Sequence, residues 1–196
     1  EKTVDGLNAA LPILTKVAAS GKQVLFVGTK KHSKENVRAA AEAIGQPYVT
    51  ERWMGGMLTN ITTVNQQIKK LRDLERRMAS GDLEKRYSKL EVQRFQEEID
   101  GLNNKYGGIK ELNGRPGALF VIDVIGDINA IREAKTLGIP VIAIVDSNAD
   151  PSLVDYVIPG NDDAIKGIQL ILDYAKEAIL EGAASAKPVA TNTREK

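Results

Sequence analysis

Residues 52–60, which read RWMGGMLTN, are the most unusual stretch of this sequence and hold its only tryptophan. A tryptophan and an arginine side by side offer flat faces that can stack on a base or on each other. The two adjacent glycines let the backbone approach a neighbour closely, and Thr59 or Asn60 can cap the helix that follows. We therefore predict contact with a large polyanion rather than bond-making chemistry. The alternative is a glycine turn whose half-buried Trp53 anchors a helix start.

A second candidate site lies in residues 27–34, VGTKKHSK, where an apolar run meets the start of a helix. Ligands of open parallel sheets dock at the carboxyl ends of strands, and a helix N-terminus with lysines nearby holds phosphate well. The sequence contains neither GxxxxGK(S/T) nor GxGxxG, so a loop that cradles a nucleotide has little support. Lysines without a glycine cradle favour contact with a polymer backbone. A solvated loop and a mononucleotide site remain as alternatives.

Two aspartates that close apolar runs, Asp123 and Asp146, are the candidates for catalysis. Paired carboxylates at one sheet edge can bind Mg²⁺ or perform acid–base chemistry. Aspartates at such positions also cap helices and close turns, and this structural role is the stronger expectation. His32 is the only histidine, so any triad or multi-histidine metal site would have to include it. We predict no catalytic residue, metal site or cofactor; a nucleotide- or sugar-phosphate-binding enzyme is the alternative.

Basic side chains gather in a third place, the long helical segment after the tryptophan loop. Lys69, Arg72 and Arg76 fall on one helical stripe, flanked by Lys70 and Arg77. We predict that these five side chains contact phosphates. More cations follow on the return arm, namely Lys85, Arg86, Lys89 and Arg94. The alternative is an ordinary solvated helix face.

Composition sets wider limits. The 196 residues are 42% hydrophobic, which suffices for a sizeable core, and no apolar run is long enough to span a bilayer. Cysteine is absent, which removes disulfide and thiolate chemistry and fits a reducing compartment. Net charge is +1, but residues through Arg115 sum to +6 and the remainder to −5. This asymmetry predicts a polarised surface unless folding intermixes the two sets.

The elements that carry these residues alternate between strands and helices. Short apolar runs predict strands at 23–29, 47–50, 118–123, 141–146 and 154–159. Helical periodicity predicts helices at 5–19, 33–45, 128–137 and 162–180, with Pro12 marking a kink or a late start in the first. This alternation predicts an α/β fold with a mostly parallel sheet and helices on both faces.

An insertion interrupts the pattern between residues 61 and 106, where apolar residues follow a narrow 3-4 spacing. Ser80-Gly81-Asp82 divides it, so we predict an antiparallel helical, coiled-coil-like hairpin; a dimeric coiled coil is the competing arrangement. The predicted domains are one discontinuous α/β unit, 1–60 with 107–181, and the inserted hairpin, 61–106. Residues 182–196 lack periodicity and are predicted to be a disordered tail.

Several motifs together resemble one known family. They occur in the right order at 26–31 (FVGTKK), 52–60 (RWMGGMLTN), 106–110 (YGGIK), 118–123 (ALFVID), 138–146 (GIPVIAIVD) and 155–163 (DYVIPGNDD). From about Thr3 to Leu180 the chain resembles the bacterial and organellar form of the small-subunit ribosomal protein S-two family. The resemblance implies a flavodoxin-like (Rossmann-like) parallel α/β domain with a helical hairpin, and a structural rather than enzymatic role in the small ribosomal subunit during translation.

The resemblance also implies partners and site residues. The expected partners are small-subunit rRNA and neighbouring ribosomal proteins, including the mRNA-capturing protein S-one, with no membrane and no small-molecule substrate. The expected location is cytoplasmic and ribosome-bound, or the stroma or matrix of an organelle. By the match of motifs, the rRNA-facing positions are Lys30, Lys31, Arg52, Trp53, Gly55, Gly56 and Asn60.

Two features leave alternatives open. Members of the family normally begin with a segment containing a His-Phe-Gly-His-like motif, which this sequence lacks ahead of Lys2, so we expect a trimmed or partial product. The hairpin could also be a docking arm for a protein, with no RNA involved. A salt series separates these interpretations, because phosphate contacts weaken steeply with salt and an apolar seam does not.

Overall fold

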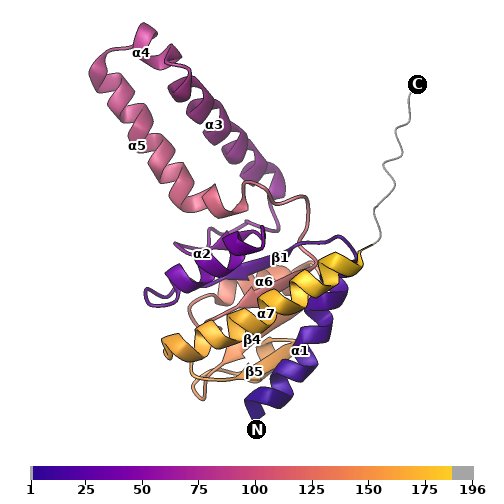
Figure 1. Cartoon of the computed structure of the whole chain (residues 1–196). Helices are drawn as coiled ribbons and strands as arrows, with labels where there is room; N and C mark the ends of the chain where they lie inside the picture. Colours follow the sequence, from indigo (N-terminus) through magenta and orange to yellow (C-terminus); the bar gives the residue numbers. More distant parts are fainter. Residues whose placement is uncertain (1, 187–196) are drawn as a thin grey trace, which may run out of the picture.

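A five-stranded, all-parallel sheet forms the centre of the computed structural model, which describes residues 2–186 (Figure 1). The strand order β2-β1-β3-β4-β5 is that of flavodoxin-like proteins, which confirms the predicted fold class. All the predicted strand positions hold strands, each somewhat shorter than expected. Their bounds are β1 (Val24–Val27), β2 (Tyr48–Val49), β3 (Ala118–Val121), β4 (Val141–Val145) and β5 (Tyr156–Pro159).

Helices cover both faces of the sheet because β1, β3 and β4 bury side chains on both sides. On one face lie α1 (Lys2–Ala19), α2 (Lys34–Ala43) and α7 (Ile165–Ser185), whose apolar residues enclose Phe26 and Phe120. On the other face α6 (Ile128–Thr136) and the tryptophan loop cover Leu25 and Leu119. The short 3-10 helix η2 (Pro151–Leu153) precedes β5.

The ends of the α/β unit differ from the sequence prediction. Helix α1 begins at Lys2 and continues through Pro12, so the late start was wrong. Helix α7 continues to Ser185, although Gly182 was expected to begin a disordered tail. A Cβ at Gly182 would lie 2.2 Å from the Thr15 carbonyl oxygen, so this glycine permits close packing of α7 against α1. The rest of the predicted tail, 187–196, lies outside the described residues.

The inserted segment forms a hairpin that projects from the sheet (Figure 1). Its arms α3 (Ile61–Ala79) and α5 (Lys89–Tyr106) pack through Leu71, Leu74 and Ile99. The tip is more elaborate than predicted, because a short helix α4 (Asp82–Arg86) follows the turn at Gly81, whose φ is 69°. After α5 the 3-10 helix η1 (Gly107–Ile109) leads the chain back to the sheet. Among the described residues, no helix has the length and apolarity needed to cross a membrane.

Candidate nucleic-acid interface

The tryptophan loop encloses a carboxylate of the protein itself. Glu133, on α6, accepts hydrogen bonds from the Trp53 indole Nε1 at 3.0 Å and the Gly56 backbone nitrogen at 2.7 Å through Oε1. Its Oε2 accepts from the Leu58 backbone nitrogen at 3.0 Å and from Thr59, whose backbone nitrogen and Oγ1 each lie at 3.1 Å. The hydrogen-bond donors of this loop are therefore directed at a carboxylate of the protein itself, the Glu133 side chain, whereas the sequence prediction was contact with a large polyanion.

This arrangement keeps Glu133 ionised. Burial alone would raise the pKa of Glu133, but the hydrogen bonds from Trp53 and from the backbone of the loop outweigh burial and lower it. Gly56 adopts a φ of 88°, which allows its N–H to turn toward the carboxylate. The loop is thus fastened to α6 by several charge-assisted hydrogen bonds.

Burial of Trp53 corrects one expectation from sequence. The side chain is 7% exposed and packs in the core beneath the sheet, so its ring is not a stacking surface for a base. The alternative interpretation, a tryptophan that anchors the start of a helix, fits the structure because α3 begins at Ile61. The Gly56 backbone N–H is already bonded to Glu133. Arg52, Gly55 and Asn60 remain exposed at the surface of the same loop.

Lys30 lies among carboxylates at the carboxyl edge of the sheet. Its Nζ is 2.9 Å from Asp162 Oδ2, 3.1 Å from Asp163 Oδ1 and 3.5 Å from Asp123 Oδ2. Burial alone would lower the pKa of Lys30, but its bonds with Asp162 and Asp163 and the charge of Asp123 raise it. These ion pairs engage Lys30 within the protein, whereas the neighbouring Lys31 is exposed.

The two candidate catalytic aspartates accept hydrogen bonds from backbone N–H groups of the turns that follow them. Asp123 Oδ1 accepts hydrogen bonds from the backbone nitrogens of Ile125 and Gly126, at 2.9 and 3.1 Å. Asp146 Oδ1 accepts from the Ser147 nitrogen at 2.6 Å. Among the described residues, no group of three or more His, Cys, Asp or Glu side chains is arranged so that it could hold a metal ion. The geometry therefore matches the structural role expected for these aspartates and offers no support for the enzyme alternative.

Asp127 is a buried carboxyl at the same edge. It stands at the N-cap position of α6, but its side chain accepts instead from Thr29, at 2.8 Å from Oγ1 and 3.3 Å from the backbone nitrogen. Burial raises the pKa of Asp127 to about 6; the Thr29 hydrogen bonds lower it in part, and the charge of Asp123 adds to the rise. The fold thus favours the protonated carboxyl.

We predict a pH-dependent stability from Asp127. Because the folded pKa of about 6 lies above the unfolded value of 3.8, its stabilising contribution is complete below pH 4 and is lost as pH rises through 6. Asp127→Asn keeps an acceptor for Thr29 and carries no charge. We expect the variant to exceed the wild type in unfolding free energy by about 2 kcal/mol at pH 7.5, with the gain fading toward pH 4. Urea denaturation at both pH values measures this, and a pH-independent difference would contradict it.

The cations of the hairpin divide into two groups. Lys69, Arg72 and Arg76 lie on the outer side of α3, where the Arg72 and Arg76 side chains are 52% and 77% exposed. Arg72 donates to the Lys110 carbonyl oxygen at 2.7 Å and pairs with Glu111, and Arg76 pairs with Asp73. The other two cations are turned toward the hairpin, where Lys70 pairs with Glu98 and Arg77 with Asp82.

Fold and charge together define a class of protein. It is a flavodoxin-like α/β domain whose ion pairs lie at the carboxyl edge of the sheet, where related folds bind ligands, and an exposed basic stripe lies on its projecting hairpin. Comparison with known proteins specifies the family. The model of the family described as Ribosomal protein S2 matches residues 1–182, and the chain belongs to this family.

Two curated relatives agree with this assignment. The protein named "Small ribosomal subunit protein uS2" of Pseudoalteromonas atlantica is 50% identical over 182 residues, which cover 93% of this chain and 74% of the relative. The protein of the same name from Marinobacter nauticus is 47% identical over 186 residues, or 95% of this chain and 74% of the relative. The family resemblance seen in the sequence is confirmed, and the protein is a ribosomal structural component rather than an enzyme.

Proposed function

We propose that the protein binds small-subunit rRNA through the exposed basic stripe Lys69, Arg72 and Arg76. The observation that carries this proposal is that the three cations share the outer side of α3, opposite the apolar seam of Leu71 and Leu74. Exposed cations that contact phosphates release bound counterions, which drives binding without base specificity. The exposed residues Lys31, Arg52, Gly55 and Asn60 are proposed as further contacts. Lys30 is enclosed by three carboxylates, and the ion pairs of Lys70 with Glu98 on α5 and of Arg77 with Asp82 on α4 turn these two cations away from the stripe.

A charge-reversed hairpin tests the stripe. We expect Lys69→Glu with Arg76→Glu to weaken binding to small-subunit rRNA about tenfold at 100 mM salt and to flatten the salt dependence of the dissociation constant. The fold should survive, because both side chains are exposed and Arg76 pairs only with Asp73 on its own helix. Filter binding across a salt series measures both quantities.

The matched control reverses charge elsewhere. Lys22→Glu with Lys166→Glu changes two exposed lysines outside the hairpin by the same charge. If the control weakens rRNA binding as much as the hairpin variant, the stripe has no special role. Binding of the wild type that is insensitive to salt would instead favour a protein-docking hairpin.

We further propose that α7 presents a surface for a neighbouring ribosomal protein. Leu170, Tyr174 and Leu180 are 56%, 45% and 53% exposed on this helix, more apolar surface than a solvent-facing helix requires. The mRNA-capturing protein S-one is the neighbour proposed from the family resemblance, and a ribosome-bound, cytoplasmic location accords with this role. Loss of S-one from subunits that carry Leu170→Ser with Tyr174→Ser would support the assignment; full retention of S-one would overturn it.

A further inference from the structure

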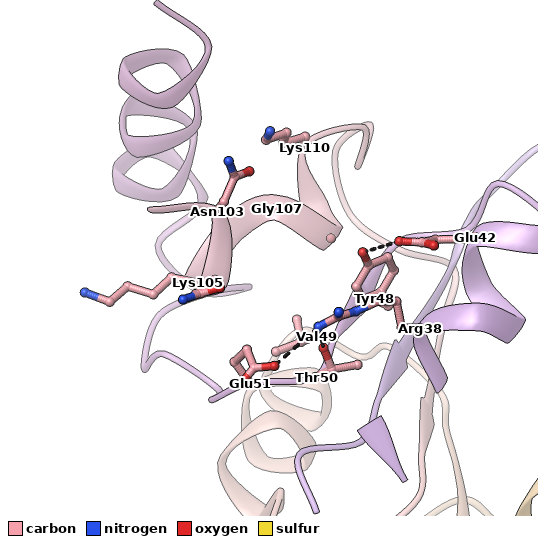
Figure 2. Close-up of a pocket in the computed structure, with 12 residues that line it drawn as sticks. Arg38, Glu42, Tyr48, Val49, Thr50, Glu51, Asn103, Lys105, Gly107 and Lys110 are labelled. Carbon is pink, nitrogen blue, oxygen red and sulfur yellow. Dashed lines mark hydrogen bonds and ion pairs between the residues drawn. The ribbon is translucent and has the colours of Figure 1, made fainter. Parts of the chain in front are cut away.

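A polar cleft of about 380 Å³ separates the base of the hairpin from the edge of the sheet (Figure 2). Arg38 and Glu42 of α2, with Tyr48, Thr50 and Glu51 of β2 and the following loop, form one wall. The other wall is the end of α5 and the glycine turn after it, lined by Asn103, Asn104, Lys105, Gly107, Gly108 and Lys110. The volume falls within the range of small-ligand pockets, about 300 to 1,000 Å³, so the cleft admits a single residue-sized group and not a duplex.

The glycine turn sets the width of this cleft. A Cβ at Gly108 would lie 2.2 Å from the Tyr48 carbonyl oxygen and 2.6 Å from the nearest ring carbon, so only glycine allows the two walls to meet here. Tyr48 is held in place by its hydroxyl, which donates to Glu42 Oε1 at 2.6 Å. Burial and the bond to Glu42 raise the pKa of Tyr48 to about 12, so the hydroxyl keeps its proton. The cleft is therefore a preformed feature.

The lining presents both donors and acceptors. Arg38 Nη2 reaches Thr50 Oγ1 and Glu51 Oε1 only at 3.4 and 3.3 Å, and Arg38 Nε is buried without a partner among the described residues. Asn104 is exposed at the opposite wall, and Lys105 extends outward at the mouth (Figure 2). The lining holds Glu42 and Glu51 beside its cations, and Glu51 already pairs with Lys34 and Arg38, so the cleft has no concentrated positive charge for a phosphate. A nucleobase edge, which carries donors and acceptors but no charge, fits this lining better.

The cleft adjoins the basic stripe of the hairpin. Lys110 lines the cleft and pairs with Glu75 at 2.6 Å, while its carbonyl oxygen accepts from Arg72. Asn103 also donates to Glu75, at 2.8 Å. Arg72, a member of the basic stripe, therefore lies directly beside the cleft.

We propose that this cleft binds the base of one unstacked nucleotide of the RNA, with the flanking phosphates at Lys105 and Arg72. The proposal rests on the rRNA-binding function proposed above and adds a base-reading site to it. Bases splayed out of single-stranded loops are the usual targets of sequence-dependent RNA recognition, because their edges are open to side chains. In the cleft, Arg38, Thr50 and Asn104 contact the base edge.

A crosslinking experiment locates the occupant. The chain contains no cysteine, so Asn104→Cys provides a single attachment point for a maleimide-linked benzophenone. After irradiation with small-subunit rRNA, we expect primer extension to stop at one or two unpaired nucleotides. Asn148→Cys is the matched control, since Asn148 is also exposed but follows β4, three strands from β2 in the sheet. It should not mark the same nucleotides.

Outcomes of this experiment separate the two proposals. Crosslinks at base-paired nucleotides, or none while binding remains salt-dependent, would overturn the base-reading cleft and leave the basic stripe standing. Loss of salt-dependent binding altogether would remove both proposals. In assembled subunits, crosslinking of Asn104→Cys to a ribosomal protein rather than to RNA would identify the cleft as a protein-docking site and also overturn the inference.

Substitutions in the cleft test base selectivity. We expect Thr50→Val and Asn104→Leu, which remove hydrogen-bonding groups without adding charge, to change the ratio of dissociation constants between single-stranded adenine and uracil decamers about tenfold, with an unchanged salt dependence. Lys105→Ala should instead weaken both decamers alike and flatten the salt dependence. Circular dichroism verifies that each variant is folded. If both cleft substitutions, at Thr50 and at Asn104, leave the ratio unchanged, the cleft does not read a base.

Discussion

Replacing Glu133 with alanine is expected to lower the free energy of unfolding by about 3 to 5 kcal/mol, because hydrogen bonds to charged groups contribute about 1.5 to 3 kcal/mol each and are not fully additive. The substitution removes the acceptor shared by the Trp53 indole, the Thr59 hydroxyl and three backbone N–H groups. The indole nitrogen would then be buried without a partner. Urea denaturation followed by circular dichroism measures the loss.

Fluorescence adds a local signal to this experiment, since Trp53 is the only tryptophan and bonds directly to Glu133. We expect its emission to change in Glu133→Ala before global unfolding. Glu177→Ala, which removes an exposed carboxylate from α7, is the control and should leave stability within about 0.5 kcal/mol of the wild type. Equal stabilities of the two variants would show that the loop does not depend on Glu133.

The sign of the pH dependence follows from the lowered pKa of Glu133. Its contribution is present above the unfolded pKa of about 4.5 and is lost as pH falls through the lower folded value. The difference between wild type and Glu133→Ala should therefore shrink below pH 4. This trend is opposite to that of Asp127, whose contribution is lost as pH rises.

The sheet could be predicted from sequence because its strands carry their own signal. Runs such as 118–121 and 141–145 are wholly apolar, and every residue in them is buried. Burial on both faces requires this composition, so a local pattern reports a global position. The hairpin was also predictable from a local pattern, because the helical spacing of its apolar residues places Leu71 and Ile99 in the seam between the two arms.

Partners distant in sequence could not be predicted. Glu133 bonds a loop 74 to 80 residues earlier, and Lys30 pairs with Asp162 and Asp163, some 130 residues later. In sequence, a glutamate on a helix and a lysine after a strand are equally compatible with an exposed, solvated side chain, so neither pattern indicates its partner. Only the folded chain shows that the donors of the tryptophan loop bind the Glu133 carboxylate and that Lys30 is surrounded by aspartates.

One missed boundary did have a local signal. Ser88 precedes α5, and its backbone nitrogen donates to Glu91 Oε2 at 2.9 Å, the capping-box pattern S-x-x-E. This pattern is present in the sequence at 88–91 and locates the start of the return arm. The Ser80-Gly81-Asp82 sequence is a more obvious turn signal, so the sequence prediction placed one turn there and missed the second helix boundary, between α4 and α5.

A glycine in the sequence can mark the end of a helix or a close contact between two helices. A matched pair of substitutions distinguishes these roles. Gly182 and Gly101 both lie within helices, in α7 and α5. A Cβ at Gly182 would lie 2.2 Å from the Thr15 carbonyl oxygen and 2.9 Å from the Ala18 side chain, where α7 packs against α1 (Figure 1). A Cβ at Gly101 would meet nothing within 4 Å.

We therefore expect the same substitution to have opposite effects at the two positions. Gly182→Ala forces α1 and α7 apart and should lower the unfolding free energy by about 2 to 3 kcal/mol, the upper part of the range for overpacked cores. Gly101→Ala replaces a poor helix former in open space and should raise it by about 0.5 to 1 kcal/mol. Urea denaturation of both variants measures the two shifts. If Gly182→Ala stabilised the protein as Gly101→Ala should, Gly182 would not be a packing glycine.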